Sequence, residues 1–264
     1  MENENDSFAE EFLDACYDGE LSKVQEALAT GRLSAENLDE GLETATELAH
    51  SEIVAALFDA GAGLSASVID SLPGANLIQD VGIVRLFFKH GLDPNAIASN
   101  GEPIIRFMAD PACAREFLSR GADPNRIGPS GIPLLVSAII SSEDTSQLEV
   151  LLEYGAKLEN EYLFAVFRRR VRQKLLKTSF LLAKGLDPNQ INAEWGTPLH
   201  CAVANGSPGL VRMLLDAGAD PTVRSTGNQY YGEPPLAAAE FIRIPKNKEE
   251  IIALLQSRQI TIHE

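Results

Sequence analysis

The sequence has 264 residues, of which 45% are hydrophobic, and 38 Asp and Glu against 22 Lys and Arg give a formal net charge of −16. No apolar run approaches the ~20 residues that span a bilayer, and the acidic N-terminus lacks the apolar stretch of a secretory signal. So acidic a chain repels nucleic acid and anionic membrane, and we expect neither as a partner.

The three cysteines, Cys16, Cys113 and Cys201, are odd in number and far apart in sequence. Neither paired metal ligands nor a disulfide framework follows from that spacing. We therefore expect reduced, buried thiols in a cytoplasmic or nuclear protein that is not secreted.

A glycine that ends a predicted helix recurs every 30 to 34 residues, at Gly31, Gly61, Gly91, Gly121, Gly155, Gly185 and Gly218. Glycine accepts the left-handed conformation that closes a helix, and the apolar residue after it folds back onto the last turn. The copies "GLDPN" at 91–95 and 185–189 and "GADPN" at 121–125 then block the helix with Asp-Pro. This period predicts a solenoid of helix–turn–helix units.

The predicted units form a single domain over residues 1–264. In chain order they span residues 8–34, 35–65, 66–97, 98–127, 128–160, 161–192, 193–225 and 226–264. Helix starts are marked by "GEPII" at 101–105, "GIPLL" at 131–135 and "EPPLAAA" at 233–239. The segments 35–62, 66–92 and 161–186 lack such a start, which makes their first helices candidates for irregular structure. The last unit differs in sequence from the other units, as the terminal capping repeat of a solenoid does.

One unit carries the full pattern, "GTPLHCAVANGSPGLVRMLLDAGADP" at 196–221. Thr197 and Pro198 suit a helix start, with a hydroxyl cap followed by a fixed φ. This unit closely resembles the ankyrin repeat, and through period and turn together the resemblance covers nearly the whole chain. It implies an all-α, ankyrin-type α-solenoid with short extended or β-hairpin fingers between the helix pairs. It also implies that the ring of His200 ties one repeat's turn to a neighbour's backbone.

The same resemblance implies a non-enzymatic protein–protein interaction scaffold or regulatory adaptor that binds through finger loops and a concave groove. The remaining histidines, His50, His90 and His263, stand in no nucleophile or metal pattern, and no glycine-rich phosphate loop is present. We therefore expect no enzyme, no catalytic residue, no cofactor and no metal, and a monomer. The alternative is a small-molecule binder or an enzyme that uses the groove near the arginine block 168–172.

Charge is unevenly placed along the chain. Residues 1–80 hold 18 Asp and Glu against two basic residues, Lys23 and Arg32. Such a field favours a basic partner segment there, and the alternative is a solvated outer face.

The block "FRRRVRQKLLK" at 167–177 is strongly basic. We expect a helix, in which Arg168 and Arg172 share a face and, with Arg169, dock an acidic or phosphorylated segment. Arg169 and Arg170 fall at inner packing positions of the repeat, so either the register shifts or they project along the groove. A solvated helix face and a nuclear-import signal are the alternatives.

Half of the chain's Trp and Tyr falls in two neighbouring fingers, "NAEWGTP" and "GNQYYGEP". Rigid aromatic residues on polar loops are typical of binding hot spots. We predict that Trp195, Tyr230 and Tyr231 project to one side as the main partner contact. Asn228, Gln229 and Glu194 form its polar rim. Burial of the rings in the core is the alternative.

Overall fold

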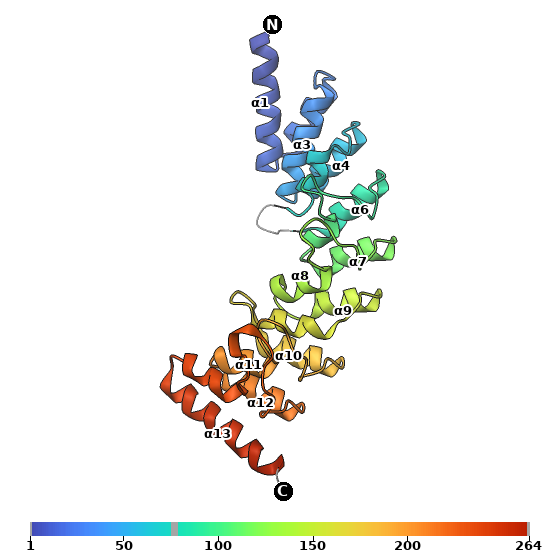
Figure 1. Cartoon of the computed structure of the whole chain (residues 1–264). Helices are drawn as coiled ribbons and strands as arrows, with labels where there is room; N and C mark the ends of the chain where they lie inside the picture. The colour runs from blue at the N-terminus through green and yellow to red at the C-terminus, as the bar shows by residue number, and fades with distance from the viewer. Residues whose placement is uncertain (1, 75–78, 263–264) are drawn as a thin grey trace. The chain divides into compact units, whose positions relative to one another are not determined.

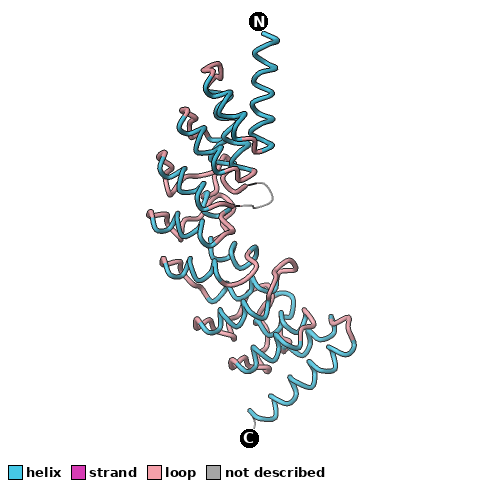
Figure 2. The backbone as a smooth tube through the Cα atoms, turned by 180° about the vertical axis from the view of Figure 1, so that it is seen from behind, coloured by secondary structure: helices cyan, strands magenta, loops and turns pink. Residues whose placement is uncertain are grey.

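The computed structural model describes residues 2–74 and 79–262. The chain divides into two compact units: unit 1 comprises residues 1–134 and 149–156, and unit 2 comprises residues 135–148 and 157–264. The expected all-helical fold is confirmed, because loops join helices and no strand occurs among the described residues (Figure 2). The predicted unit boundaries within a single domain stay a prediction, and residues 75–78 of the unit 66–97 lie outside the described residues.

Unit 1 consists of helix pairs that follow one another in chain order (Figure 1). The pairs are α1 (Glu2–Asp18) with α2 (Leu21–Ala29), α3 (Ala35–Glu47) with α4 (Ser51–Asp59), α5 (Ala66–Ser71) with α6 (Val81–Lys89), and the 3₁₀ helix η2 (Ile104–Phe107) with α7 (Pro111–Ser119). The first helices α1, α3 and α5 pack on one another, and so do the second helices α2, α4, α6 and α7. Each pair therefore buries its apolar face on its neighbour.

Unit 2 continues the same pattern. Its pairs are the 3₁₀ helix η3 (Asn160–Phe167) with α10 (Lys174–Ala183), α11 (Pro198–Ala204) with α12 (Pro208–Asp216), and the 3₁₀ helix η5 (Pro235–Phe241) with α13 (Pro245–Ile262). A short 3₁₀ turn, η4 (Asn228–Tyr230), lies in a finger. Helices α8 (Leu134–Ser141) and α9 (Ser146–Glu153) each hold residues of both units.

Some first helices are irregular. The helix of unit 35–65, α3, is regular because Ser34 and Asn37 form a capping box at its start. In contrast, α5 has only six residues and η3 is a 3₁₀ helix. The starts "GEPII" and "EPPLAAA" also lead into 3₁₀ helices, η2 and η5, where the sequence favoured regular ones.

The helix-ending turns are confirmed in detail. All seven glycines have positive φ, from 64° at Gly31 to 100° at Gly61. At Gly91 the backbone forms the Schellman pattern: Leu92 N–H donates to Phe87 O at 3.0 Å and Gly91 N–H to Phe88 O at 3.2 Å. Leu92 is buried, as the fold-back predicts.

The asparagine of the repeated turn has a second role. The Asn95 amide donates to Gly121 O at 3.1 Å and accepts from Asp123 N–H at 3.0 Å, both in the next turn. Asn189 repeats this with Gly218 and Asp220. The motif therefore both ends a helix and joins consecutive turns within a unit.

Candidate functional site

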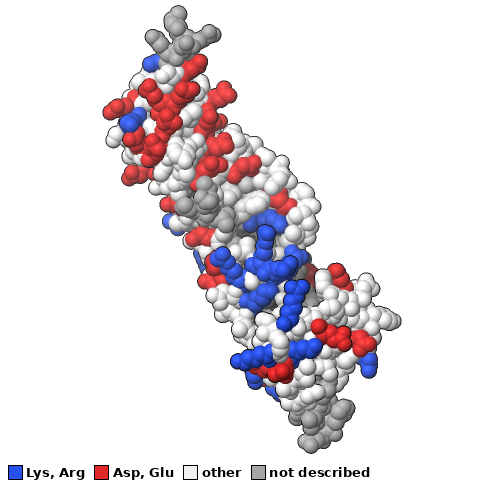
Figure 3. Space-filling model, turned by 90° about the vertical axis from the view of Figure 1, so that its left-hand side faces the viewer, with Lys and Arg blue, Asp and Glu red and all other residues white. Residues whose placement is uncertain are grey.

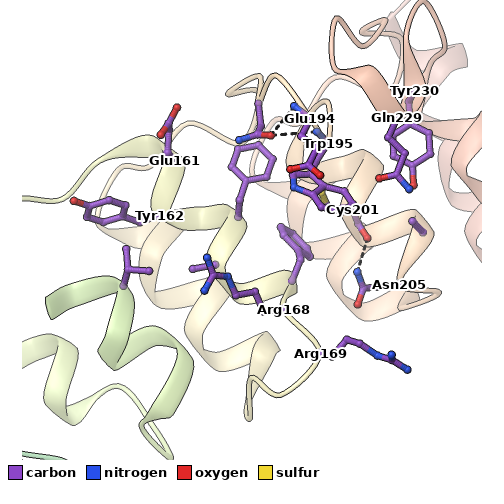
Figure 4. A pocket seen from close by; sticks show the side chains of 16 residues that line it. Glu161, Tyr162, Arg168, Arg169, Glu194, Trp195, Cys201, Asn205, Gln229 and Tyr230 are labelled. Atoms are coloured by element: carbon purple, nitrogen blue, oxygen red, sulfur yellow. Dashed lines mark hydrogen bonds between the residues drawn. The ribbon is translucent and has the colours of Figure 1, made fainter. Parts of the chain in front are cut away.

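A groove of about 750 Å³ opens in unit 2, and every residue that lines it belongs to that unit. It lies between η3, the loop after η3, helix α11 and two fingers (Figure 4). The loop, residues 168–173, is called the arginine loop. The finger before α11, residues 186–197, is finger A, and the finger before η5, residues 219–234, is finger B.

Finger A is a tight hairpin that holds Trp195 in place. Asn192 and Gly196 exchange two backbone hydrogen bonds of 2.8 and 3.1 Å as an antiparallel bridge. The Asn192 side chain accepts from the N–H groups of Glu194 and Trp195 at 2.9 and 3.1 Å. Trp195 remains 41% exposed and lines the groove, so a large ring is offered from a fixed backbone.

Finger B is joined to finger A by its backbone. Asn228 N–H donates to Ala193 O and Gln229 N–H to Glu194 O, each at 3.0 Å. The contact requires glycine at position 227, because a Cβ there would lie 2.6 Å from the backbone nitrogen of Gly196. The two fingers therefore form one connected wall of the groove.

The prediction that Tyr230 projects with the other rings is wrong. Tyr230 is only 5% exposed; its ring stacks on His200 at 5.5 Å and meets Phe241 edge-on at 5.9 Å. The turn η4 aims the first tyrosine of "YY" inward, which leaves Tyr231 78% exposed outside the groove lining.

Tyr230 nevertheless lines the groove, and its hydroxyl makes no hydrogen bond to any described residue. Burial raises the pKa of this phenol above its ordinary value. The ring is buried, whereas the hydroxyl borders the open groove, so a ligand atom there can bond to it.

His200 fixes the wall behind Tyr230. Its Nδ1 accepts from Thr197 N–H at 3.2 Å, which places the proton on Nε2, and Nε2 donates to Glu233 O at 3.0 Å. The expected tie to a neighbouring turn is therefore confirmed. Burial lowers the pKa of His200, against the smaller raising effect of the Glu233 hydrogen bond.

The predicted helix over the arginine block is also wrong, so Arg168 and Arg172 share no helix face. Helix η3 ends at Phe167, and residues 168–173 form a loop before α10. In α11 the positions expected for Arg169 and Arg170 are filled by fully buried Ala202 and Val203. Unpaired guanidinium groups cannot occupy such positions, so the helix stops and the arginines turn outward.

The arginine loop is anchored by its apolar residues, because Phe167 and Val171 are buried. The basic residues of the block 167–177 differ in their contacts and burial. Arg172 pairs with Glu143, away from the groove lining. Lys177, at the end of the basic block, is fully buried and donates to Ile139 O at 2.9 Å and Ser142 O at 2.6 Å. Only Arg168 and Arg169 line the groove.

The charged side chains of the groove lie on two edges. The basic edge is Arg168 and Arg169, toward the bottom of Figure 4, and the acidic edge is Glu161 and Glu194, toward its top. Among the described residues, none of these four side chains forms an ion pair or a side-chain hydrogen bond. On the face in Figure 3, Lys and Arg gather in one patch, whereas Asp and Glu crowd the N-terminal part of the chain.

The groove thus brings together most of the predicted contact residues. Arg168, Arg169, Glu194, Trp195, Gln229 and Tyr230 line it. Asn228 lines a shallower neighbouring cavity with Gln229, and Arg172 and Tyr231 line neither. That these residues bind a partner stays a prediction. Sequence analysis missed Glu161 and Tyr162, which line the groove from the first turn of η3; no local motif marks them.

Cys201 lines the groove but is not activated for chemistry. Burial raises the pKa of the Cys201 thiol to about 12, so it lacks the thiolate that a nucleophile needs. The thiols of Cys16 and Cys113 are likewise free and buried, as expected. Within residues 2–74 and 79–262, no group of His, Cys, Asp and Glu is arranged to hold a metal ion. In the same part of the chain no helix has the length and apolar character to cross a membrane.

Residues 166–215 match the family model "Ankyrin repeats (many copies)". Two curated proteins are similar over part of their length. The putative ankyrin repeat protein FPV244 of Fowlpox virus is 30% identical over 98 residues, 37% of this chain and 14% of that protein. The glycerophosphocholine phosphodiesterase gde1 of Schizosaccharomyces pombe is 32% identical over 84 residues, 32% of this chain and 7% of that enzyme. The chain thus spans a small part of both.

Two solved structures share the fold over nearly their whole length. The human ASB11 ankyrin repeat domain is 18% identical, with a TM-score of 0.51 over 92% of this chain and 96% of the other. The ankyrin repeat domain of Bcl-3, a member of the IkappaB protein family, is 19% identical, with a TM-score of 0.55 over 93% and 97%.

Proposed function

Because the chain is an ankyrin-repeat protein, we propose that it is a non-enzymatic interaction module that holds a segment of a partner protein in the unit-2 groove. Ankyrin repeats generally mediate protein–protein interactions. The single observation that carries the proposal is convergence: the arginine loop and both fingers line one groove, although they are distant in sequence.

The groove is organised before a partner arrives. Backbone hydrogen bonds fix finger A and join it to finger B, so few groups must be ordered on binding. Trp195 adds a large ring whose exposed part is available to a partner, as at the centre of many interfaces. Arg168 and Arg169 supply donors for a carboxylate or phosphate.

A second candidate surface lies on unit 1. The excess of Asp and Glu within residues 1–80 would attract a basic segment by raising the rate of encounter. On this proposal, added salt slows association with a basic partner through unit 1. If salt does not change the association rate, the acidic residues contribute only to solubility.

The groove proposal is tested by selecting a displayed library of short random linear peptides against the full chain. Trp195→Ala serves as a counter-target and Tyr231→Ala as the matched control, because both rings are exposed but only Trp195 lines the groove. We expect the same peptides to be enriched by the wild type and the control, with an affinity loss of about 2 kcal/mol for Trp195→Ala. Equal enrichment on Trp195→Ala would contradict the groove proposal.

A further inference from the structure

We propose that the segment bound in the groove is bipolar, with an acidic side chain on the basic edge and a basic side chain on the acidic edge. This inference rests on the proposed function and names the chemistry of its partner. It follows from the arrangement of the two edges, from the apolar surface between them and from the unpartnered hydroxyl of Tyr230.

The two edges are separate and unsatisfied. Arg168 and Arg169 lie toward one side of the groove and Glu161 and Glu194 toward the other (Figure 4). Ion pairs occur elsewhere in unit 2, as between Arg212 and Glu250 at 3.3 Å, but none joins these edges among the described residues. Each edge can therefore accept a charge of the opposite sign from outside the chain.

A segment with one sign of charge fits poorly. A wholly acidic segment would place carboxylates against Glu161 and Glu194 and would approach a chain of net charge −16. A wholly basic segment would face Arg168 and Arg169. Repulsion between like charges opposes binding, so each edge disfavours a partner segment whose charges all have the sign of that edge. A segment with both signs is attracted at each edge and repelled at neither, whereas an uncharged segment gains nothing from either edge.

The surface of the groove between the basic edge and the acidic edge suits a short stretch of polypeptide. Trp195, Phe164 and Ala165 offer apolar surface in the groove, and the Tyr230 hydroxyl, at the end of a buried ring, offers a hydrogen bond at the groove surface. A backbone carbonyl of an extended segment can accept that bond. Successive side chains of an extended segment point to opposite sides, so the acid and the base stand an odd number of positions apart.

The test uses peptides enriched by the wild-type chain in the selection above. We expect their consensus to hold an acid and a base at odd spacing beside an apolar residue. Synthetic versions with the acid or the base changed to Gln are titrated by fluorescence polarisation, and each change weakens binding about fivefold or more. These peptide changes leave the protein untouched, so folding cannot explain their effect.

Double-mutant cycles assign each charge to its edge. In the pair variant Arg168→Gln/Arg169→Gln, the acid-to-Gln peptide loses no further affinity, while the base-to-Gln peptide still does. The variant Glu161→Gln/Glu194→Gln shows the reverse. A control with exposed residues outside the groove lining, Glu240→Gln/Arg243→Gln, leaves all affinities unchanged.

The possible failures are distinguishable. Trp195-dependent peptides with only one sign of charge would overturn the bipolar inference and leave the groove function standing, and so would additive effects in both cycles. The absence of any enriched peptide, or enrichment independent of Trp195, would overturn the groove function and this inference with it.

Discussion

Replacing Asn189 with Ala tests whether the amide of the repeated turn holds neighbouring turns together. The change deletes the bond to Gly218 O at 2.9 Å and the bond from Asp220 N–H at 2.8 Å. A hydrogen bond contributes about 0.5–1.5 kcal/mol net, and here water can reach the two backbone groups left behind. We therefore expect a loss of about 1–2 kcal/mol in the free energy of unfolding.

The assay is urea unfolding followed by circular dichroism, with Asn228→Ala as the control. Asn228 is also a finger asparagine, but it is exposed and its side chain bonds to no described residue. Asn189→Asp keeps the acceptor and removes the donor, so its loss falls between those of the wild type and Asn189→Ala. If Asn189→Ala and Asn228→Ala unfold at the same urea concentration with equal slopes, the amide does not link the turns.

Three further outcomes are expected. Tyr230→Phe keeps the ring on His200 but removes the free hydroxyl, so affinity for a selected peptide falls a few-fold in calorimetry while the melting temperature holds; unchanged affinity would mean that no ligand atom meets the hydroxyl. Burial lowers the pKa of His200 in the folded chain, so below about pH 6.5 the unfolded chain binds a proton there more readily than the folded chain does. The free energy of unfolding therefore decreases as the pH is lowered, and His200→Gln should lose this dependence. Gly218→Val costs about 1–3 kcal/mol through its φ of 92° alone, because no atom lies within 4 Å of the added Cβ; an unaltered melting temperature would refute the strain.

The repeat was predictable because the residues that end each helix are adjacent in sequence. A glycine, an apolar residue and Asp-Pro determine the turn within five positions, and the structure has positive φ at Gly91, Gly185 and their equivalents. The link made by Asn95 was not predictable in the same way. Its partners, Gly121 O and Asp123 N–H, lie one repeat away, and no rule of local sequence names a partner at that distance.

The site was predictable as two patches, whereas their meeting in one groove was not. The spacing of Arg168 and Arg172 favoured a helix, but a helix continued there would have buried Arg169 and Arg170. Composition placed both tyrosines of "YY" on a finger, yet a single turn of 3₁₀ helix decides that Tyr230 is buried and Tyr231 is exposed. Glu161 lines the groove from η3, a segment in which the sequence carries no helix-start motif.

The most direct test of the groove uses Trp195, the only tryptophan of the chain. Its indole is 41% exposed in the free protein and lines the groove, so acrylamide quenches its fluorescence. A selected peptide that lacks tryptophan should reduce this quenching saturably, with the dissociation constant that calorimetry gives for the same peptide. Binding measured by calorimetry without any change in the quenching of Trp195 would place the partner elsewhere and contradict the groove.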